Sequence, residues 1–290
     1  MSLRLSATQS AHSLDEASIQ AFRRDGFCSS IYVLSGSEAM GLRAQVEMLE
    51  ARSHGRLSCL VRAKPHLLIP FLWNVVHDPR IVDKIESLLG PDLYCIGSST
   101  IDKPVGSDGY VAWHQDATFW GLSRTEGATA WLALSSSRPE SGCMEVVPGS
   151  HTQQLDHLDT EDPLNMLGAR EAVCQQVDPS ATRPLVLESG QMSVHHPLVL
   201  HGSARNRTGD RRLGFVIRYV PASVRQDGGT VTLVRGRNLS QMPLEVAPEG
   251  ELHPAALARH GEIIRRCSAV IRRAKQAHLE AVRLRSEPAA

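Results

Sequence analysis

The segment Trp113-His114-Gln115-Asp116 is the most informative stretch of this 290-residue chain. Residues 110–113, which lead into it, are rich in aromatic and β-branched side chains and indicate a strand. Because alternate residues of a strand share a face, His114 and Asp116 are expected to point the same way. An imidazole nitrogen and a carboxylate oxygen can bind one metal ion, so the segment predicts two ligands of a metal site.

A third metal ligand has to come from a distant part of the chain. His201, which is expected to follow an apolar strand at 198–200, would complete two histidines and one carboxylate on one face of an ion. That arrangement is the facial triad of non-haem Fe(II) oxygenases, and it leaves the other face open for a cosubstrate and oxygen. The neighbours His195 and His196 compete for this role. The His-Gly-Ser context and the spacing to Arg212 favour His201. Either His195 or His196 is expected to contact a metal ligand without binding the metal itself.

Arg212 is the candidate holder of a dicarboxylate. It begins an alternating strand pattern over residues 212–218, in which Gly214 shares its face. A guanidinium can pair with a carboxylate through two hydrogen bonds, and the small residue beside it should leave room for a ligand. We therefore expect Arg212 to hold the far carboxylate of 2-oxoglutarate, whose 2-oxo-acid end would chelate the iron.

The rest of the sequence predicts a mainly β fold with flanking helices. Short runs of β-branched and aromatic residues alternate with turn clusters after residue 92, which indicates a barrel or jelly roll. Ser13 and Glu16 resemble a capping box, with Ser13 as the N-cap and Gly26 as the C-cap. The expected helices are 13–25, 37–53, 67–76, 79–89 and 254–284. The expected strands are 27–34, 93–101, 110–113, 128–134, 143–147, 185–187, 191–195 and 213–220.

These elements predict one domain over residues 1–290. Residues 1–91 are expected to be a helical N-terminal support, and 92–221 the jelly-roll core. The core contains a long, polar insertion at 152–178, and a segment of that length is typically a functional lid or mobile. It is expected to order when substrate binds. Residues 222–290 form a C-terminal extension with a long helix.

Composition argues against several kinds of partner. The 31 Lys and Arg balance 31 Asp and Glu, and aromatic residues make up 4%, so nucleic acid is not expected. The longest apolar run, 67–73, is interrupted by Pro70, and residues 1–10 lack a signal-peptide core, which predicts no membrane partner and a cytoplasmic location. The basic helix at the end predicts a solvated face or a dimer contact, hence a monomer or homodimer.

The cysteines and remaining histidines are expected to have no role in a site. The six cysteines are scattered without a Cys-x-x-Cys pair and predict ordinary thiols. They are Cys28, Cys59, Cys95, Cys143, Cys174 and Cys267. His151 is expected to serve a turn. The other histidines have no coherent spacing and are expected at the surface; they are His12, His54, His66, His77, His157, His253, His260 and His278.

Four stretches extend the metal-binding pattern. They are WHQDATFW at 113–120, WLAL at 131–134, ESGCMEVVPGSH at 140–151, and HGS at 201–203 followed by 206–212. Together they resemble the phytanoyl-CoA dioxygenase family of Fe(II)/2-oxoglutarate oxygenases, over residues 14–221. The resemblance implies a double-stranded β-helix, which is a cupin-like jelly roll. It also implies Fe(II) held by His114, Asp116 and His201, with Arg212 as the 2-oxoglutarate arginine.

Further site residues follow from the resemblance and from position. The resemblance implies that Thr129, Trp131 and Ser203 line the cosubstrate pocket. Phe119 and Trp120 flank the metal-binding segment and are either barrel core or a substrate wall, with Trp120 the better candidate. Lys103 ends the preceding strand. Its charge is suited to an anionic substrate or cosubstrate, and a solvated strand end is the alternative.

The presence of Asp116 bears on the reaction. Related halogenases carry Ala or Gly in place of this carboxylate, which opens a position for chloride, so Asp116 favours hydroxylation. We expect a dioxygenase that uses Fe(II), O2 and 2-oxoglutarate to hydroxylate a C–H bond of a small organic molecule, as in secondary metabolism. The same triad would serve desaturation, epoxidation or cyclisation. A non-catalytic jelly-roll ligand-binding protein and a zinc hydrolase are the alternatives from other classes. The sequence names no substrate.

Overall fold

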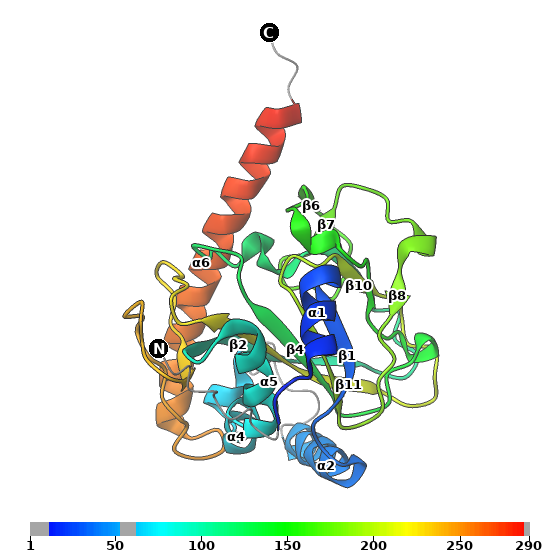
Figure 1. Ribbon diagram of the computed structural model, residues 1–290. Coiled ribbons are helices and arrows are strands. Elements are labelled where there is room, and N and C mark those ends of the chain that lie inside the picture. Colours follow the sequence, from blue (N-terminus) through cyan, green and yellow to red (C-terminus); the bar gives the residue numbers. More distant parts are fainter. Residues whose placement is uncertain (1–11, 53–61, 287–290) are drawn as a thin grey trace, which may run out of the picture.

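The computed structural model describes residues 12–52 and 62–286. It is a mixed structure in which antiparallel sheets are flanked by helices (Figure 1). A six-stranded sheet contains, in spatial order, β1 (Phe27–Tyr32), β9 (Gln191–His195), β4 (Ala128–Ala133), β11 (Arg212–Pro221), β2 (Leu93–Lys103) and β12 (Thr232–Arg235). A four-stranded sheet contains β3 (Val111–His114), β10 (His201–Ser203), β5 (Glu145–Val146) and β8 (Arg183–Pro184). The hairpin β6 (His157–Asp159) and β7 (Glu171–Val173) is separate.

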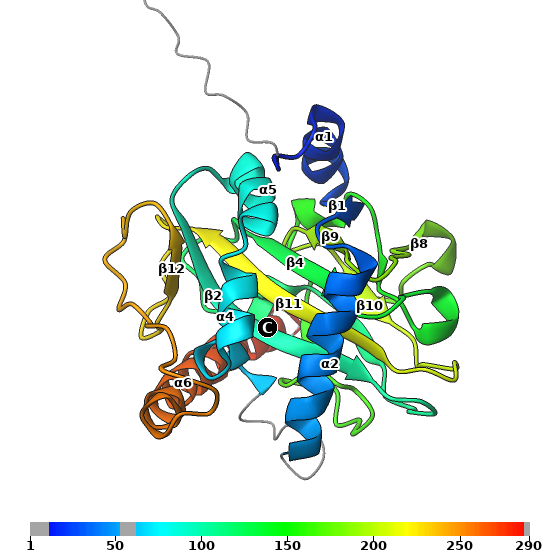
Figure 2. The same ribbon diagram turned by 90° about the horizontal axis from the view of Figure 1, so that it is seen from below.

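The helices lie mainly on one face of the six-stranded sheet. They are α1 (Glu16–Asp25), α2 (Gly36–Arg52), α4 (Pro70–Val76), α5 (Pro79–Leu89) and α6 (Pro254–Ser286). The 3-10 turns are η1 (Pro65–Leu67), η2 (Asp116–Phe119), η3 (Pro139–Ser141), η4 (Ser150–Thr152) and η5 (Pro179–Ala181). Figure 2 shows α2, α4 and α5 lying across one face of this sheet.

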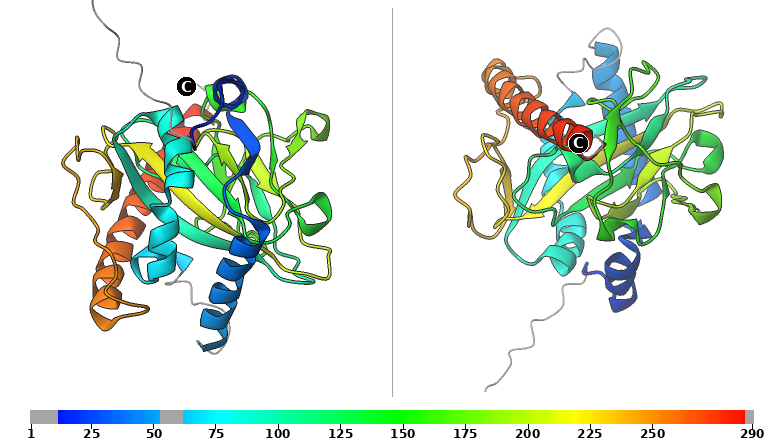
Figure 3. Two further views of the ribbon diagram at one scale, coloured as in Figure 1. Left: turned by 60° about the horizontal axis from the view of Figure 1, so that its bottom comes forward. Right: turned by 90° about the horizontal axis from the view of Figure 1, so that it is seen from above.

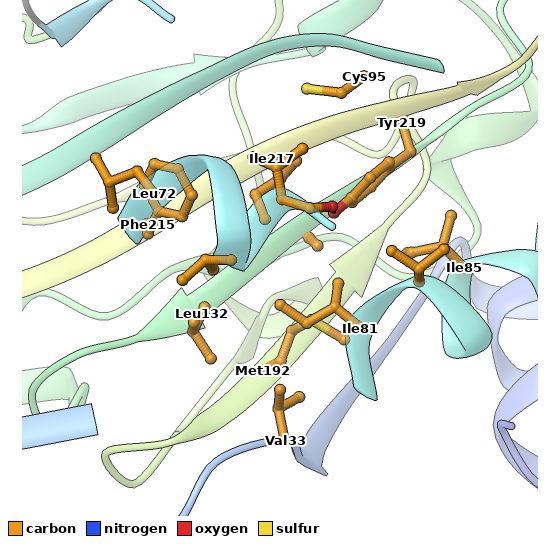
Figure 4. Close-up of a cluster of buried hydrophobic side chains, with 14 of the residues drawn as sticks. Val33, Leu72, Ile81, Ile85, Cys95, Leu132, Met192, Phe215, Ile217 and Tyr219 are labelled. Atoms are coloured by element: carbon orange, nitrogen blue, oxygen red, sulfur yellow. The ribbon is translucent and has the colours of Figure 1, made fainter. Parts of the chain in front are cut away.

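The main hydrophobic core lies between that sheet face and the helices. Phe215 and Ile217 of β11 are buried there against Leu72 of α4 and Ile81 of α5 (Figure 4). Because strand residues alternate, Arg212, Gly214, Val216 and Arg218 point to the opposite face, away from the helices. Burying the apolar half of each strand on the helices therefore leaves the other half to line the space toward the four-stranded sheet.

The N-terminal part of the described chain contributes a strand as well as helices. β1 pairs with β9 at the edge of the six-stranded sheet. The helix before it begins at Glu16 with Asp15 as N-cap, whose carboxylate accepts a hydrogen bond from the Ser18 amide. The predicted N-cap at Ser13 is therefore wrong, because an aspartate nearer the helix caps at least as well. Gly26 is the C-cap in the left-handed region, as predicted.

Other element predictions differ at their ends. β8 lies at Arg183–Pro184, before the predicted 185–187, and β5 covers only two residues of the predicted 143–147. The predicted strand at 191–195 and the helix at 79–89 match β9 and α5. The insertion at 152–178 contains the hairpin β6–β7, where no strand was expected.

The C-terminal helix α6 packs along one side of the sheets, coloured orange to red in Figure 3. The His278 ring meets Phe119 of η2 edge-on, with centroids 5.6 Å apart. Lys275 donates to Asp159 of β6 at 2.7 Å. These contacts join the helix both to the segment after β3 and to the insertion.

Three histidines expected at the surface are buried. His66 and His157 are fully buried and His260 is 3% exposed. His66 hydrogen-bonds Ser98 and Thr232, which explains how the interior accepts its polar ring. The predictions for His54 and Cys59 lie outside the described residues. The five cysteines that the structure describes are free thiols. In the described ranges, no helix combines the length and the apolar character that crossing a membrane requires.

Candidate functional site

His114, Asp116 and His201 converge in the structure. One ligand atom from each lies within 4.8 Å of the other two. The ring Nδ1 of His114 lies 2.8 Å from the Ala112 carbonyl, and that of His201 lies 2.9 Å from the Val199 carbonyl. Each Nδ1–H therefore donates to a backbone oxygen, which leaves Nε2 as the ring nitrogen that can bind a metal.

Strand pairing explains the meeting of the two histidines. His201 begins β10 and is the direct partner of His114, at the end of β3, in the antiparallel register. The two rings lie 4.1 Å apart, centroid to centroid. The predicted apolar strand before His201 is wrong, because residues 198–200 form a turn that leads into β10.

Asp116 reaches the site by a different route from the one predicted. β3 ends at His114, Gln115 is extended, and Asp116 begins the turn η2. The extended Gln115 still places the two flanking side chains on one side. The chain then turns away, so the strand expected to carry Asp116 ends before it.

The carboxylate of Asp116 is held by groups from the six-stranded sheet. Its Oδ2 accepts a hydrogen bond from Thr129 of β4 at 3.0 Å and lies 3.4 Å from Nε2 of His195 in β9. Burial alone would raise the pKa of Asp116, but the adjacent imidazoles of His114 and His195 outweigh it and lower that pKa well below the usual value. The carboxylate is thus ionised, as metal binding requires.

The electrostatics of His201 also favour metal binding. Burial lowers the pKa of His201 well below that of an ordinary histidine, and the neighbouring His114 acts in the same direction. The imidazole is therefore neutral near pH 7, which is the form that binds metal. His195, which was weighed as an alternative ligand, lies beside Asp116 with its ring 4.6 Å from that of His201. His196 points elsewhere and packs near Phe22 and His151.

Arg212 lies in a second, cationic part of the interior. It is 2% exposed, its Nη1 donates to the Gly142 carbonyl, and its Nε has no partner among the described residues. Its guanidinium lies over the Trp131 ring, 5.0 Å from the centroid. A Cβ at Gly214 would clash with the same ring. The room expected beside Arg212 is thus taken by the indole, and Gly214 is needed to admit Trp131.

Lys103 lies next to Arg212 and is fully buried. The two residues are register partners across β2 and β11. The Lys103 ammonium donates to Ser203 Oγ at 2.6 Å and also to the Ala204 carbonyl. A solvated strand end is therefore wrong for Lys103. Burial and the nearby Arg212 lower the pKa of Lys103 to about 6.

No described carboxylate forms an ion pair with Lys103 or Arg212. Two buried cations side by side are costly unless an anion meets them, and Arg212 Nε is an unused donor. The residues present therefore fit a bound dicarboxylate. The structure brings Trp131 and Ser203 into this region, and it places Thr129 against Asp116.

The substrate candidates fall in different places. Trp120 is half-buried and lies under the Arg218 guanidinium, 5.7 Å from Cζ to the ring centroid. Phe119 is 3% exposed, and its ring packs edge-on against His157 and His278. Phe119 therefore belongs to the packing between η2 and α6, and the structure does not bring its ring to the metal-ligand cluster.

Two functional features were missed from the sequence. Gln115, between the candidate ligands, donates its backbone N–H to Nε2 of His157 at 2.9 Å, and the backbone N–H of His157 donates to Nε2 of His278 at 3.0 Å. No sequence signal links these distant positions. Arg218 also faces the interior, and its even spacing from Arg212 in the predicted strand could have revealed it.

A cavity of about 510 Å³ lies between β3 and the insertion. Its lining includes Trp113, Glu145, Val173, Gln175 and Ser203. The insertion thus forms one wall of a cavity that reaches a predicted site residue.

The family follows from comparison with known proteins. The family model described as Phytanoyl-CoA dioxygenase (PhyH) matches residues 22–214. The chain belongs to the phytanoyl-CoA dioxygenase family. Membership confirms the prediction that the chain is an enzyme of the 2-oxoglutarate-dependent dioxygenase family. Fe(II) and 2-oxoglutarate are the cofactors of that family.

Two curated relatives share about 30% of their residues with this chain over the matched part. The chain is 28% identical over 190 residues to the probable alpha-ketoglutarate-dependent hypophosphite dioxygenase of Stutzerimonas stutzeri. It is 31% identical over 146 residues to the peroxisomal phytanoyl-CoA dioxygenase of Rattus norvegicus. The matches cover 63% and 49% of this chain, and 66% and 43% of those relatives.

Among solved structures, the non-heme monooxygenase ThoJ in its apo form is similar over most of the chain. The TM-score is 0.80 at 30% identity, and the match covers 89% of this chain and 99% of ThoJ. CytC3, at 21% identity and a TM-score of 0.64, shares the fold over 84% of this chain and 96% of its own.

Proposed function

We propose that this chain is a 2-oxoglutarate-dependent oxygenase that hydroxylates a C–H bond of a small organic molecule. The observation that carries the proposal is the convergence of His114, Asp116 and His201, with ligand atoms within 4.8 Å of one another. Two imidazoles and an ionised carboxylate on one side match the Fe(II) facial triad. When bound, Fe(II), 2-oxoglutarate and O2 supply the oxidant, with release of succinate and carbon dioxide.

The cosubstrate is proposed to bind between the metal ligands and Arg212. The free Nε–H of Arg212 and the Lys103 ammonium would meet its far carboxylate, while Trp131 shields the guanidinium from water. Ser203 holds the Lys103 ammonium in place. Thr129 keeps Asp116 oriented through its hydrogen bond.

The ligand at position 116 bears on which reaction is favoured. Asp116 supplies a carboxylate, so no ligand position is vacated for a halide, and hydroxylation is favoured. Desaturation, epoxidation and cyclisation would use the same ligands. The insertion at 152–178 is proposed to contact substrate through the cavity beside β3.

The proposal also includes the fold type, the number of domains, the location and the oligomeric state. The six-stranded and four-stranded sheets, whose inner faces meet at Asp116 and Thr129, support a double-stranded β-helix. We also propose a single domain over residues 1–290, a cytoplasmic location, and a monomer or homodimer without nucleic-acid or membrane partners. The neutral charge balance supports the absence of a nucleic-acid partner.

Anaerobic mixing of the metal-free protein with Fe(II) and 2-oxoglutarate tests the proposal. A metal-to-ligand charge-transfer band is expected in the visible spectrum. Arg212→Ala should weaken 2-oxoglutarate binding by about 2–5 kcal/mol, because it removes one partner of a buried charge pair. Arg205→Ala, at an exposed arginine paired with Asp108, is the control and should leave the affinity unchanged.

The absence of a band together with no succinate formation would favour a non-catalytic ligand-binding protein. Activity that is insensitive to Arg212→Ala would favour a zinc hydrolase. Either result contradicts the proposed function.

A further inference from the structure

Arg218 is a second arginine on the inner face of β11. Its direct partner on β4 is Thr129, whose hydroxyl donates to Asp116. Arg218 therefore lies at the same position along the strands as Thr129, which contacts the candidate metal ligand Asp116. Arg212 lies on the same strand face, at roughly 3.3 Å per residue about 20 Å away. The two guanidinium groups therefore lie at different ends of the interior, and a cosubstrate anion at Arg212 leaves Arg218 for another ligand.

The contacts of Arg218 leave most of its donors unused. Its Nη1 donates to Ser99 Oγ at 3.2 Å, and its Cζ lies 5.7 Å from the centroid of the Trp120 ring. Among residues 12–52 and 62–286, no carboxylate lies in ion-pair contact with it. A guanidinium has five N–H donors, so a half-buried one with a single neutral acceptor can still take a ligand oxygen pair.

The surroundings hold this guanidinium in place. The Trp120 carbonyl accepts a hydrogen bond from Gln226 at 2.7 Å, and the Trp120 ring packs on a buried apolar cluster that includes Tyr94 and Val220. Gly97 faces Arg218 across β2, where a Cβ would lie 4.0 Å from the Arg218 Cδ. Arg218, Ser99 and Trp120 thus form a preorganised group with two polar side chains and one aromatic wall.

We propose that Arg218, Ser99 and Trp120 bind a carboxylate of the substrate. The inference rests on the proposed function and narrows the substrate class to organic acids with an apolar part that packs on Trp120. A single guanidinium with one hydroxyl matches the planar, singly charged carboxylate, whose two oxygens accept parallel N–H bonds. The acid group would lie near Asp116 and so hold the attached carbon chain beside the metal.

Matched pairs of ligands test the proposal on the whole protein. The anaerobic complex with Fe(II) and 2-oxoglutarate is titrated calorimetrically with aliphatic, aromatic and N-acetylamino monocarboxylic acids, each paired with its primary amide. At least one acid should bind more tightly than its amide by about tenfold or more, because only the acid pairs with the half-buried Arg218 guanidinium.

Variants then assign the preference to Arg218. Arg218→Gln should abolish the difference between acid and amide, and Arg218→Lys should retain part of it. Arg124→Gln changes an exposed arginine that donates a hydrogen bond to Ser223, and it should behave as the wild type.

The charge-transfer band separates this inference from the function on which it rests. The band should form in Arg218→Gln as in the wild type. Its absence from the wild type would overturn the proposed function and this inference together. Loss of the band only in Arg218→Gln would show that Arg218 serves Asp116, and would overturn the substrate site alone. A panel in which no acid binds better than its amide, or a preference that survives in Arg218→Gln, would also overturn it.

Discussion

The carboxylate of Asp116 lies among three imidazoles and one hydroxyl, contributed by four different strands and turns. His114 comes from β3, His201 from β10, His195 from β9 and Thr129 from β4. This many partners around one partly buried carboxylate is more than a capping or surface role needs. The arrangement concentrates charge at the point where the two sheets meet, which is a physical reason to expect a cation there.

Replacement of Asp116 by Ala should abolish tight Fe(II) binding. The change removes the only anionic ligand, so the affinity for Fe(II) is expected to fall by about two orders of magnitude or more. Equilibrium dialysis with Fe(II) under anaerobic conditions measures it. Asp108→Ala, at an exposed aspartate, is the control. Unchanged affinity in Asp116→Ala would place the metal elsewhere.

The pKa of Lys103 predicts proton uptake when 2-oxoglutarate binds. Without an anion, Lys103 with a pKa of about 6 is mostly neutral at pH 7.5. A bound dianion favours the charged ammonium, so binding should take up a proton. The affinity should therefore be highest below pH 6 and fall as the pH rises above it. Calorimetry in buffers of different ionisation enthalpy counts the protons; Lys103→Met should take up none at that position.

At the level of elements, the turn η2 receives support from a distant helix. Gln115 donates to His157, and the backbone of His157 donates to His278 of α6. Phe119 fills the space between these rings. A Cβ at Gly121 would come within 2.8 Å of Val270 in α6, so only glycine admits this close approach. The candidate metal-binding segment is thus supported by contacts with the C-terminal helix.

His157→Ala should therefore weaken metal binding without removing a ligand. Loss of a partner that orients the ligand segment typically costs about 10–100-fold in metal affinity. Fe(II) affinity and the charge-transfer band report the effect, with the melting temperature measured alongside. Arg272→Ala, at an exposed position of α6, is the matched control. A lower melting temperature with normal Fe(II) affinity would show that His157 only stabilises the fold.

Local patterns predicted several elements because those elements satisfy local rules. The strand at 191–195 and the helix at 79–89 have strong periodicity and clear ends, and both are present. The strand predicted at 110–113 ends one residue before β3 does, but the turn η2 that carries Asp116 was not predictable, because its contacts are tertiary. Arg212 was found from its spacing and Gly214, although the space beside Gly214 proved to hold Trp131.

Residues that meet only in three dimensions escaped prediction. The sequence predicts for Lys103 either a contact to an anionic substrate or cosubstrate or a solvated strand end, and does not reveal its burial, which depends on the distant carbonyls of Gly142 and Ser203. His66 was expected at the surface for the same reason, since its partners come from β2 and β12. No periodicity in one stretch of sequence reports such pairings.

For the whole molecule, a buried ion pair joins the C-terminal extension to the core. The Lys64 ammonium contacts Glu245, and Glu245 also accepts from Thr230 at 2.6 Å and Thr232 at 2.7 Å. Both charged side chains are almost completely buried. The pair ties the segment after β12 to the chain before η1.

Lys64→Met should destabilise the protein strongly. It leaves the Glu245 carboxylate buried without its cation, which is expected to cost about 3–5 kcal/mol of unfolding free energy. Urea denaturation measures this cost. The double variant Lys64→Met/Glu245→Leu should recover part of it, because no unpaired charge remains. The exposed pair of Arg259 and Glu249 is the control, and its removal should cost at most about 1 kcal/mol.

The position of α6 has a consequence for comparing members of the family. The helix lies entirely beyond residues 22–214, the part that the family model matches, yet it backs the turn that carries Asp116. A chimera that exchanged only this tail with a relative would leave the candidate metal ligands His114, Asp116 and His201 unaltered and would be expected to change the rigidity of the segment that carries Asp116. A change in turnover in such a chimera would therefore originate in the tail, outside the residues that the family model matches.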